Sequence, residues 1–170
     1  ITDLGMQGKL SFNESLSRRI ELFTINREHI NEVITLLKSR ISESFVKNRE
    51  FFIENANNIY IISGGFKEYI APVVRDFGIS DSHILANTFI FDKAGKVIGY
   101  DTNNLLCQAN GKANQVKALK LKGFVSVIGD GYTDYQIREQ GNADTFFAYT
   151  ENVARESIIG KADYVVTSIN

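Results

Sequence analysis

The first third of the chain carries apolar residues at helical spacing. One stretch has the period of an amphipathic helix, with apolar residues at Ile30, Val33, Ile34 and Leu37. Asn26 precedes this stretch, and because asparagine is a favoured N-cap residue we predict that the helix begins after it. An earlier helix is expected around Leu16 and Ile20, and a further one near residues 46–55. The pattern predicts no strand in this third of the chain.

The pattern changes after residue 56. Short apolar runs rich in β-branched residues predict strands at 58–63, 124–130, 145–150 and 163–167. Residues 84–101 are predicted to form two strands around a turn at Gly95. Helical patterns are expected between the strands, at 66–78, 113–123, 133–140 and 152–159. Because strands alternating with helices form βαβ units, we predict an α/β fold with a Rossmann-like, mostly parallel sheet. The expected division is a small helical cap over 1–55 and an α/β core over 56–170.

Composition narrows the function classes. The chain has 170 residues, of which 44% are hydrophobic and 23% charged, as in one soluble globular domain. Its formal net charge of -1 argues against a nucleic-acid partner, which would require a basic excess. No apolar run approaches the roughly 20 residues that a membrane-spanning helix needs, so no membrane partner is expected. A single cysteine, Cys107, favours a reducing, cytoplasmic setting.

Candidate chemistry lies where the predicted strands end, because open α/β sheets bind ligands beyond the carboxyl ends of their strands. The first core strand is expected to end in Ser63, Gly64 and Gly65. Two glycines let a backbone approach a ligand closely, and a following helix offers free N–H groups to an anion. The alternative, a serine N-cap with glycines serving only the turn, is equally compatible with this short stretch.

A second strand end carries two carboxylates in the sequence GDGYTD. Asp130 is expected at the end of the strand and Asp134 in the first turn of the next helix. Carboxylate oxygens suit Mg²⁺, which takes few protein ligands together with water and phosphate. Helix capping by Asp134 and a turn at Asp130 are the structural alternative. Two like charges placed close together nevertheless need a cation or a proton between them.

A third feature is the sequence GK, in which Lys112 opens a predicted helix. Taken alone, Lys112 could be an ordinary surface lysine. The combination is more informative, because a hydroxyl, an ammonium group and an Mg²⁺-binding acidic pair are the groups needed to hold a phosphoryl group. Catalysis at such a site consists mainly of positioning and charge neutralisation.

With these motifs in order, the chain resembles the haloacid-dehalogenase-type phosphatases, and among them the phosphoserine phosphatases. The segments IISGGF, GK and GDGYTD are similar to the second, third and fourth motifs of that family. The stretch MQGKLSFNESLSRRI is similar to the phosphoserine-phosphatase cap, whose substrate-facing positions correspond to Met6, Phe12 and Arg19. This stretch points to O-phosphoserine as the substrate, because many phosphatases share the core motifs.

The resemblance also implies a role for each residue. Ser63, with the Gly64 and Gly65 backbone, would bind the transferring phosphoryl group, and Lys112 would neutralise its charge. Asp130 would bind Mg²⁺. Asp134 would support the metal site or orient Lys112, and Thr133 would belong to the substrate-binding residues. Arg19 would pair with the substrate carboxylate, a planar match for guanidinium, and Arg18 would replace it if the helix is rotated.

One motif of the family is missing. The pattern Asp-x-Asp-x-Thr/Val, which supplies the nucleophile and the general acid/base, does not occur in these residues. We therefore expect it upstream of residue 1, on the first core strand, and expect this stretch alone not to turn over substrate. The activity, hydrolysis of phosphoserine through an aspartyl-phosphate in serine biosynthesis, would belong to a longer protein. The resemblance also suggests covalent fusion to a 3-phosphoglycerate dehydrogenase domain.

Other functions remain open at this point. A related phosphatase could act on phosphothreonine, a phosphosugar or another small phosphometabolite. A non-catalytic phosphate-binding module would keep the phosphate-holding groups without the nucleophile.

Overall fold

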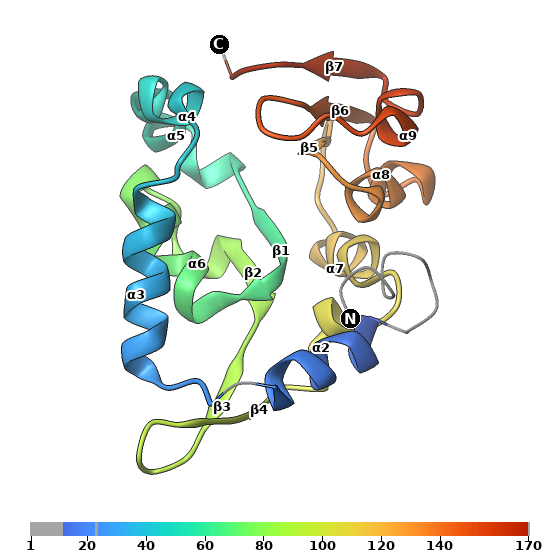
Figure 1. The fold of residues 1–170 in the computed structure, drawn as a ribbon. Coiled ribbons are helices and arrows are strands. Elements are labelled where there is room, and N and C mark those ends of the chain that lie inside the picture. The colour runs from blue at the N-terminus through green and yellow to red at the C-terminus, as the bar shows by residue number, and fades with distance from the viewer. Residues whose placement is uncertain (1–11, 23, 170) are drawn as a thin grey trace.

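Helices form the first part of the chain in the computed structural model, which describes residues 12–22 and 24–169. They are α2 (Phe12–Glu21), α3 (Arg27–Lys38), α4 (Glu43–Lys47) and α5 (Arg49–Glu54). The predicted amphipathic helix is confirmed as α3. The predicted third helix is in fact two short helices, α4 and α5, which together begin earlier than residue 46. Figure 1 shows α3 running alongside α6 (Lys67–Val74), against which it packs.

Asn26 caps α3 as predicted. Its side-chain oxygen accepts a hydrogen bond from the backbone N–H of His29 at 3.0 Å. In return, Nδ1 of His29 accepts a hydrogen bond from the backbone N–H of Asn26 at 3.3 Å. These two bonds satisfy N–H groups that a helix start leaves without intrahelical partners.

The middle of the chain contains the first parallel sheet. In it β1 (Ile61–Phe66) pairs with β2 (Ile84–Asn87), and α6 forms the crossover between them. The antiparallel strands β3 (Phe89–Phe91) and β4 (Val97–Tyr100) form the predicted hairpin around Gly95, whose φ of 79° suits a glycine. Residues 84–101 thus contain three strands, where two were predicted. The predicted strand at 58–63 begins later and continues through the Ser-Gly-Gly segment.

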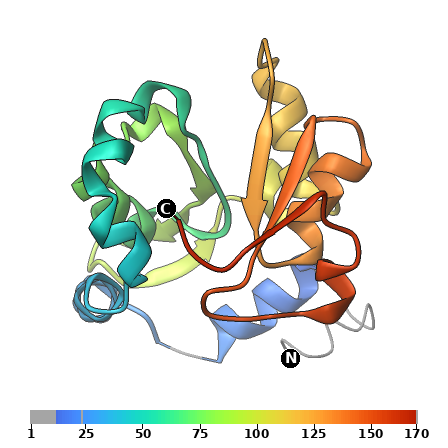
Figure 2. The same cartoon turned by 90° about the horizontal axis from the view of Figure 1, so that it is seen from above.

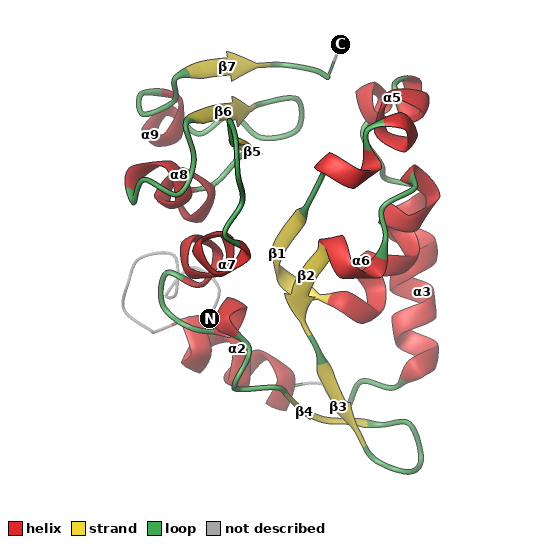
Figure 3. Ribbon diagram, turned by 180° about the vertical axis from the view of Figure 1, so that it is seen from behind, coloured by secondary structure: helices red, strands yellow, loops and turns green. Residues whose placement is uncertain are grey.

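The last part of the chain contains a second parallel sheet, in the order β5 (Ser126–Gly129), β6 (Thr145–Tyr149) and β7 (Tyr164–Val166). Its helices are α7 (Gly111–Leu119), α8 (Tyr132–Glu139) and α9 (Glu156–Ile159). Figure 3 shows α8 and α9 beside this sheet, with α7 next to α8. Short 3-10 helices lie at Ala56–Asn58, Arg75–Phe77, Asp81–His83 and Leu105–Cys107. Among the described residues, no helix combines the length and apolar character required to cross a membrane.

The two parallel sheets do not join into the single sheet that we expected. Within the described residues, β1 pairs only with β2, and β5 pairs only with β6. Figure 2 shows the β1–β2 sheet and the β5–β6–β7 sheet on opposite sides of the molecule. A cavity of about 480 Å³ lies between them and is lined by Ile62 of β1 and by Val127 and Ile128 of β5. Each sheet therefore presents an open strand edge toward this cavity.

The Asn26 cap gives a stability prediction. Replacing Asn26 with Ala should lower the free energy of unfolding by about 1 kcal/mol, because it removes the side-chain acceptor. Asn31→Ala, at an exposed position inside the same helix, should change it by no more than about 0.5 kcal/mol. Urea denaturation measures both values, and an equal loss in the two variants would contradict the capping role.

Candidate active site

A lysine–aspartate pair links α7 to α8. Lys112 lies in the first turn of α7, and its Nζ donates a hydrogen bond to Oδ1 of Asp134 at 2.6 Å. The other oxygen of Asp134 accepts a hydrogen bond from the backbone N–H of Gly131 at 3.1 Å. The side chains of Lys112 and Asp134 are only 20% and 12% exposed. Both oxygens of Asp134 thus have partners, and the ammonium group of Lys112 is held in one place.

Two glycines make room for this pair. A Cβ added at Gly111 would lie 2.4 Å from the carbonyl oxygen of Leu105. One added at Gly129 would lie 2.3 Å from Cγ of Asp134. No side chain fits at such distances, so glycine at these positions lets α7 begin close to its preceding turn and lets Asp134 pack against the end of β5.

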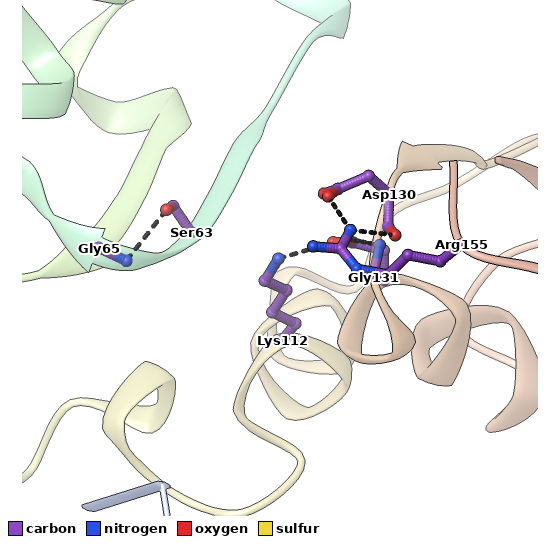
Figure 4. Close-up of polar contacts among 7 residues, drawn as sticks. Ser63, Gly65, Lys112, Asp130, Gly131 and Arg155 are labelled. Atoms are coloured by element: carbon purple, nitrogen blue, oxygen red, sulfur yellow. Dashed lines mark hydrogen bonds and ion pairs between the residues drawn. The ribbon is translucent and has the colours of Figure 1, made fainter. Parts of the chain in front are cut away.

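Asp130 follows β5 directly and has an arginine partner. Nη1 of Arg155 donates a hydrogen bond to the backbone oxygen of Asp130 at 2.8 Å and also contacts its Oδ2. Arg155 lies between β6 and α9, so it reaches Asp130 from the end of the neighbouring strand (Figure 4). Here the side chains are 36% and 48% exposed, which leaves this pair far more open to solvent than Lys112 and Asp134.

Ser63 lies on the other sheet. Its Oγ accepts a hydrogen bond from the backbone N–H of Gly65 at 3.0 Å, and Nδ2 of Asn87 donates to the carbonyl oxygen of Gly64 at 2.9 Å. A Cβ at Gly65 would lie 2.8 Å from the hydroxyl of Tyr69, so a larger residue here would make the tip of the Tyr69 side chain shift. In Figure 4 Ser63 is on a separate ribbon from Lys112 and Asp130, with its hydroxyl turned toward Gly65.

The structure therefore assembles only part of the predicted site. It brings Lys112, Asp130 and Asp134 together at the end of β5. Ser63, Gly64 and Gly65 lie in the last part of β1, where the strand was predicted to end, and β1 continues one residue further to Phe66, which pairs with Asn87. Of these six residues, Asp134 is the one that lines the cavity between the sheets, together with Ile62, the neighbour of Ser63 in β1.

The predicted substrate-binding residues are only partly described. Met6 lies outside the described residues. Phe12 and Arg19 are in α2, but their side chains lie outside the description. Thr133 is exposed in the first turn of α8. Helix α2 packs its buried Leu16 in one cluster with Cys107, close to the turn that leads into α7, so the segment that carries Arg19 lies on the Lys112 side of the molecule.

The sequence did not lead us to predict that Arg155, or the loop between β6 and α9 that contains it, belongs to the candidate site. Glu151 accepts hydrogen bonds from the Ser44 hydroxyl and, at 2.6 Å, from the hydroxyl of Tyr149. The Ser44 bond is the largest cause that holds the pKa of Glu151 below its usual range, and the Tyr149 bond adds to it. This network ties the loop after β6 to α4. No short motif indicates the contact between Arg155 and Asp130, because it depends on the carboxyl end of β6 lying at the same sheet edge as that of β5.

The donor set fits Mg²⁺ only in part. Asp130 supplies a partly exposed carboxylate, the kind of ligand that Mg²⁺ uses together with phosphate and water. Asp134 uses both oxygens elsewhere, so it is placed to orient Lys112. The described part of the chain contains no group of three or more His, Cys, Asp or Glu side chains that could hold a metal ion. Beyond Asp130, a bound Mg²⁺ would depend on ligands from outside this set.

Gly129→Ala tests the packing of Asp134. Because the added Cβ would overlap Asp134, that side chain must turn away from Lys112, and we expect the free energy of unfolding to fall by roughly 1–3 kcal/mol. Gly99→Ala is the matched control, since no atom lies within 4 Å of its added Cβ. Urea denaturation should show a change of no more than about 0.5 kcal/mol for this control. Equal effects of the two changes would contradict the proposed packing.

Comparison with known proteins identifies the family. The profile of the haloacid dehalogenase-like hydrolases matches residues 9–139. Chloroplastic phosphoserine phosphatase of Arabidopsis thaliana is 32% identical over 97% of this chain and 57% of its own length. Phosphoserine phosphatase of Drosophila melanogaster is 27% identical over 98% of this chain and 63% of its own length. The chain thus spans about six-tenths of the length of these relatives.

A solved structure agrees with this match. A phosphoserine phosphohydrolase-like protein from Francisella tularensis is 32% identical and superposes with a TM-score of 0.82, over 99% of this chain and 78% of that one. The sequence resemblance and the predicted α/β fold are thereby confirmed. This chain belongs to the haloacid dehalogenase-like hydrolase family, and the two relatives from Arabidopsis and Drosophila are phosphoserine phosphatases.

Proposed function

We propose that this chain is the major part of a Mg²⁺-dependent phosphomonoesterase that hydrolyses O-phosphoserine to serine and phosphate. The observation that carries the proposal is the position of Lys112, whose ammonium group is held by Asp134 close to the partly exposed carboxylate of Asp130. The relatives are named as phosphoserine phosphatases, which supports phosphoserine as the substrate. The stretch MQGKLSFNESLSRRI, which resembles the phosphoserine-phosphatase cap, supports the same substrate.

The residues of this chain would act mainly by binding and neutralising a phosphoryl group. The ammonium group of Lys112 faces the negative charge of the phosphate, while Asp134 keeps that group oriented. The Ser63 hydroxyl and the backbone N–H groups of Gly64 and Gly65 donate hydrogen bonds to phosphate oxygens. Asp130 would be one ligand of Mg²⁺, and the bound ion would supply positive charge next to the phosphate.

The nucleophile would come from a strand that inserts between β1 and β5. The facing edges of β1 and β5 are open. Strands at the centre of a parallel sheet are normally covered on both faces, but Ile128 of β5 is 53% exposed and Phe124, just before this strand, is 76% exposed. Both side chains line the cavity between the sheets. A parallel strand there would end near Lys112, where an Asp-x-Asp-x-Thr/Val motif would place the attacking carboxylate. The bond from phosphorus to the serine oxygen would break as the carboxylate attacks, and the second aspartate would protonate that oxygen. Water deprotonated by the same aspartate would then hydrolyse the aspartyl-phosphate and release phosphate.

Substrate selection would belong to the cap. Arg19 would bind the carboxylate of phosphoserine through two parallel hydrogen bonds, with Met6 and Phe12 beside the serine carbon atoms. Four further expectations stay predictions. They are the boundary between cap and core at residues 55 and 56, the fusion to a 3-phosphoglycerate dehydrogenase, the role in serine biosynthesis and the cytoplasmic setting.

The substrate assignment is tested with the chain joined to a segment that carries the Asp-x-Asp motif. We expect Mg²⁺-dependent phosphate release from phosphoserine. Arg19→Gln should raise the KM for phosphoserine roughly tenfold or more, the effect of losing a hydrogen-bonded charge pair. The KM for phosphoethanolamine, which lacks the carboxylate, should stay unchanged. Arg40→Gln, at an exposed arginine outside α2, is the matched control and should leave both KM values unchanged. An equal KM increase for both substrates would refute the role of Arg19.

The inserted strand is tested by hydrogen exchange of the chain alone. A peptide with an apolar run before Asp-x-Asp-x-Val should slow amide exchange in β1 and β5, because their free backbone groups gain partners. The exchange of β7, at the far edge of its sheet, should not change. A scrambled peptide of the same composition is the control. Unchanged exchange in β1 and β5, or equal slowing by the scrambled peptide, would rule out the insertion.

A further inference from the structure

Strand β1 leaves the regular ladder of its sheet at the Ser-Gly-Gly segment. Ile62 pairs with Leu85, and the next pair along the strands joins Phe66 to Asn87. Three residues of β1 therefore lie between these two pairs, where β2 contributes only one. A bulge of this kind takes backbone groups out of the ladder, and such groups need other partners when they are shielded from water. Asn87 supplies one of these partners, because its Nδ2 donates a hydrogen bond to the carbonyl oxygen of Gly64 at 2.9 Å.

The side chain of Asn87 is used for this contact alone. Asn87 is fully buried, at 0% exposed. Among the described residues, no group donates a hydrogen bond to its Oδ1. A buried acceptor without a partner costs stability, and this cost offsets what the bond from Nδ2 contributes. A contribution to stability therefore explains this asparagine poorly, and a role in placing the Ser-Gly-Gly segment explains it better.

One planar peptide unit connects Asn87 to Ser63. The carbonyl group of Gly64 and the N–H group of Gly65 belong to the same peptide unit, in which they point in opposite directions. A partner that holds the oxygen therefore also fixes the direction of the N–H group. That N–H group donates to Oγ of Ser63 at 3.0 Å, the contact drawn in Figure 4. Because Oγ is the acceptor in this bond, the hydroxyl hydrogen of Ser63 can be donated to an oxygen of a phosphoryl group.

We propose, on the basis of the function proposed above, that Asn87 is a positioning residue for the Ser63 hydroxyl. It acts through the peptide unit between Gly64 and Gly65 and does not itself touch the substrate. Hydrogen bonds that follow one another polarise each other, so the bond from Asn87 also strengthens the N–H donor that holds Oγ. Without the amide of Asn87, the peptide unit is free to rotate, and the Ser63 hydroxyl is no longer held in one direction.

A double-mutant cycle tests this role in the chain joined to the segment that carries Asp-x-Asp. Removing a whole donor to a developing negative charge costs roughly 10²–10³ in kcat. Asn87→Leu only loosens the Ser63 hydroxyl, so it should lower the kcat for phosphoserine by less, roughly tenfold. Combined with Ser63→Ala, the same change should lower kcat further by about twofold at most, because the group that Asn87 positions is already gone. Asn87→Ala, which cannot overfill the site, should show the same pattern.

Asn48→Leu is the matched control. It removes another side-chain amide that donates to a backbone carbonyl oxygen at 2.9 Å, that of Ser44. This control should lower the urea midpoint of unfolding at least as much as Asn87→Leu does, and it should leave kcat unchanged. A role of Asn87 in stability alone predicts instead that the two variants affect kcat equally.

The outcomes separate this role from the proposed function. Unchanged kcat in Asn87→Leu and Asn87→Ala, an equal loss in Asn48→Leu, or losses from Asn87→Leu and Ser63→Ala that multiply in the double variant would overturn the positioning role alone. An unmodified protein that releases no phosphate from phosphoserine would refute the proposed function, and the role of Asn87 with it.

Discussion

The ion pair between Lys112 and Asp134 is the interaction on which the candidate site depends. It joins the first turn of α7 to the first turn of α8 and packs beside the end of β5. Glycines at 111 and 129 leave the space it needs. Because the pair is mostly buried, the ammonium group has little freedom to move. A lysine side chain that is already fixed in this way loses little further conformational entropy when it binds a phosphate.

The other groups of the candidate site lie on or around two separate sheets. The charged groups lie in segments around the β5–β6–β7 sheet. Asp130 follows β5, Arg155 precedes α9, and Lys112 opens α7, which packs against α8 and also against β1. The β1–β2 sheet carries the neutral donors around Ser63, with Asn87 holding the backbone of Gly64. Ile62 packs against the apolar cluster around Val116 and Ile137, so the sheets share a core even though their edges do not pair. A strand between them would complete both the sheet and the site.

Local features were predictable from the sequence, and features that depend on distant partners were not. The cap of Asn26 and the end of the 3-10 helix at Gly78, with its φ of 78°, need only neighbouring residues. The extension of β1 through Ser63 depends on pairing with Asn87, more than twenty residues away. The contact of Arg155 with Asp130 likewise requires the parallel order of β5 and β6, which no short motif specifies.

In the proposed function, one phosphate lies between the two sheets and contacts both. The decisive measurement is a crystal structure of the chain together with the segment that carries Asp-x-Asp, grown with phosphate and Mg²⁺. We expect phosphate oxygens at about 3 Å from both Oγ of Ser63 and Nζ of Lys112, with the cation on Asp130. Phosphate bound to only one of these two side chains, or bound elsewhere with both of them unchanged, would contradict it.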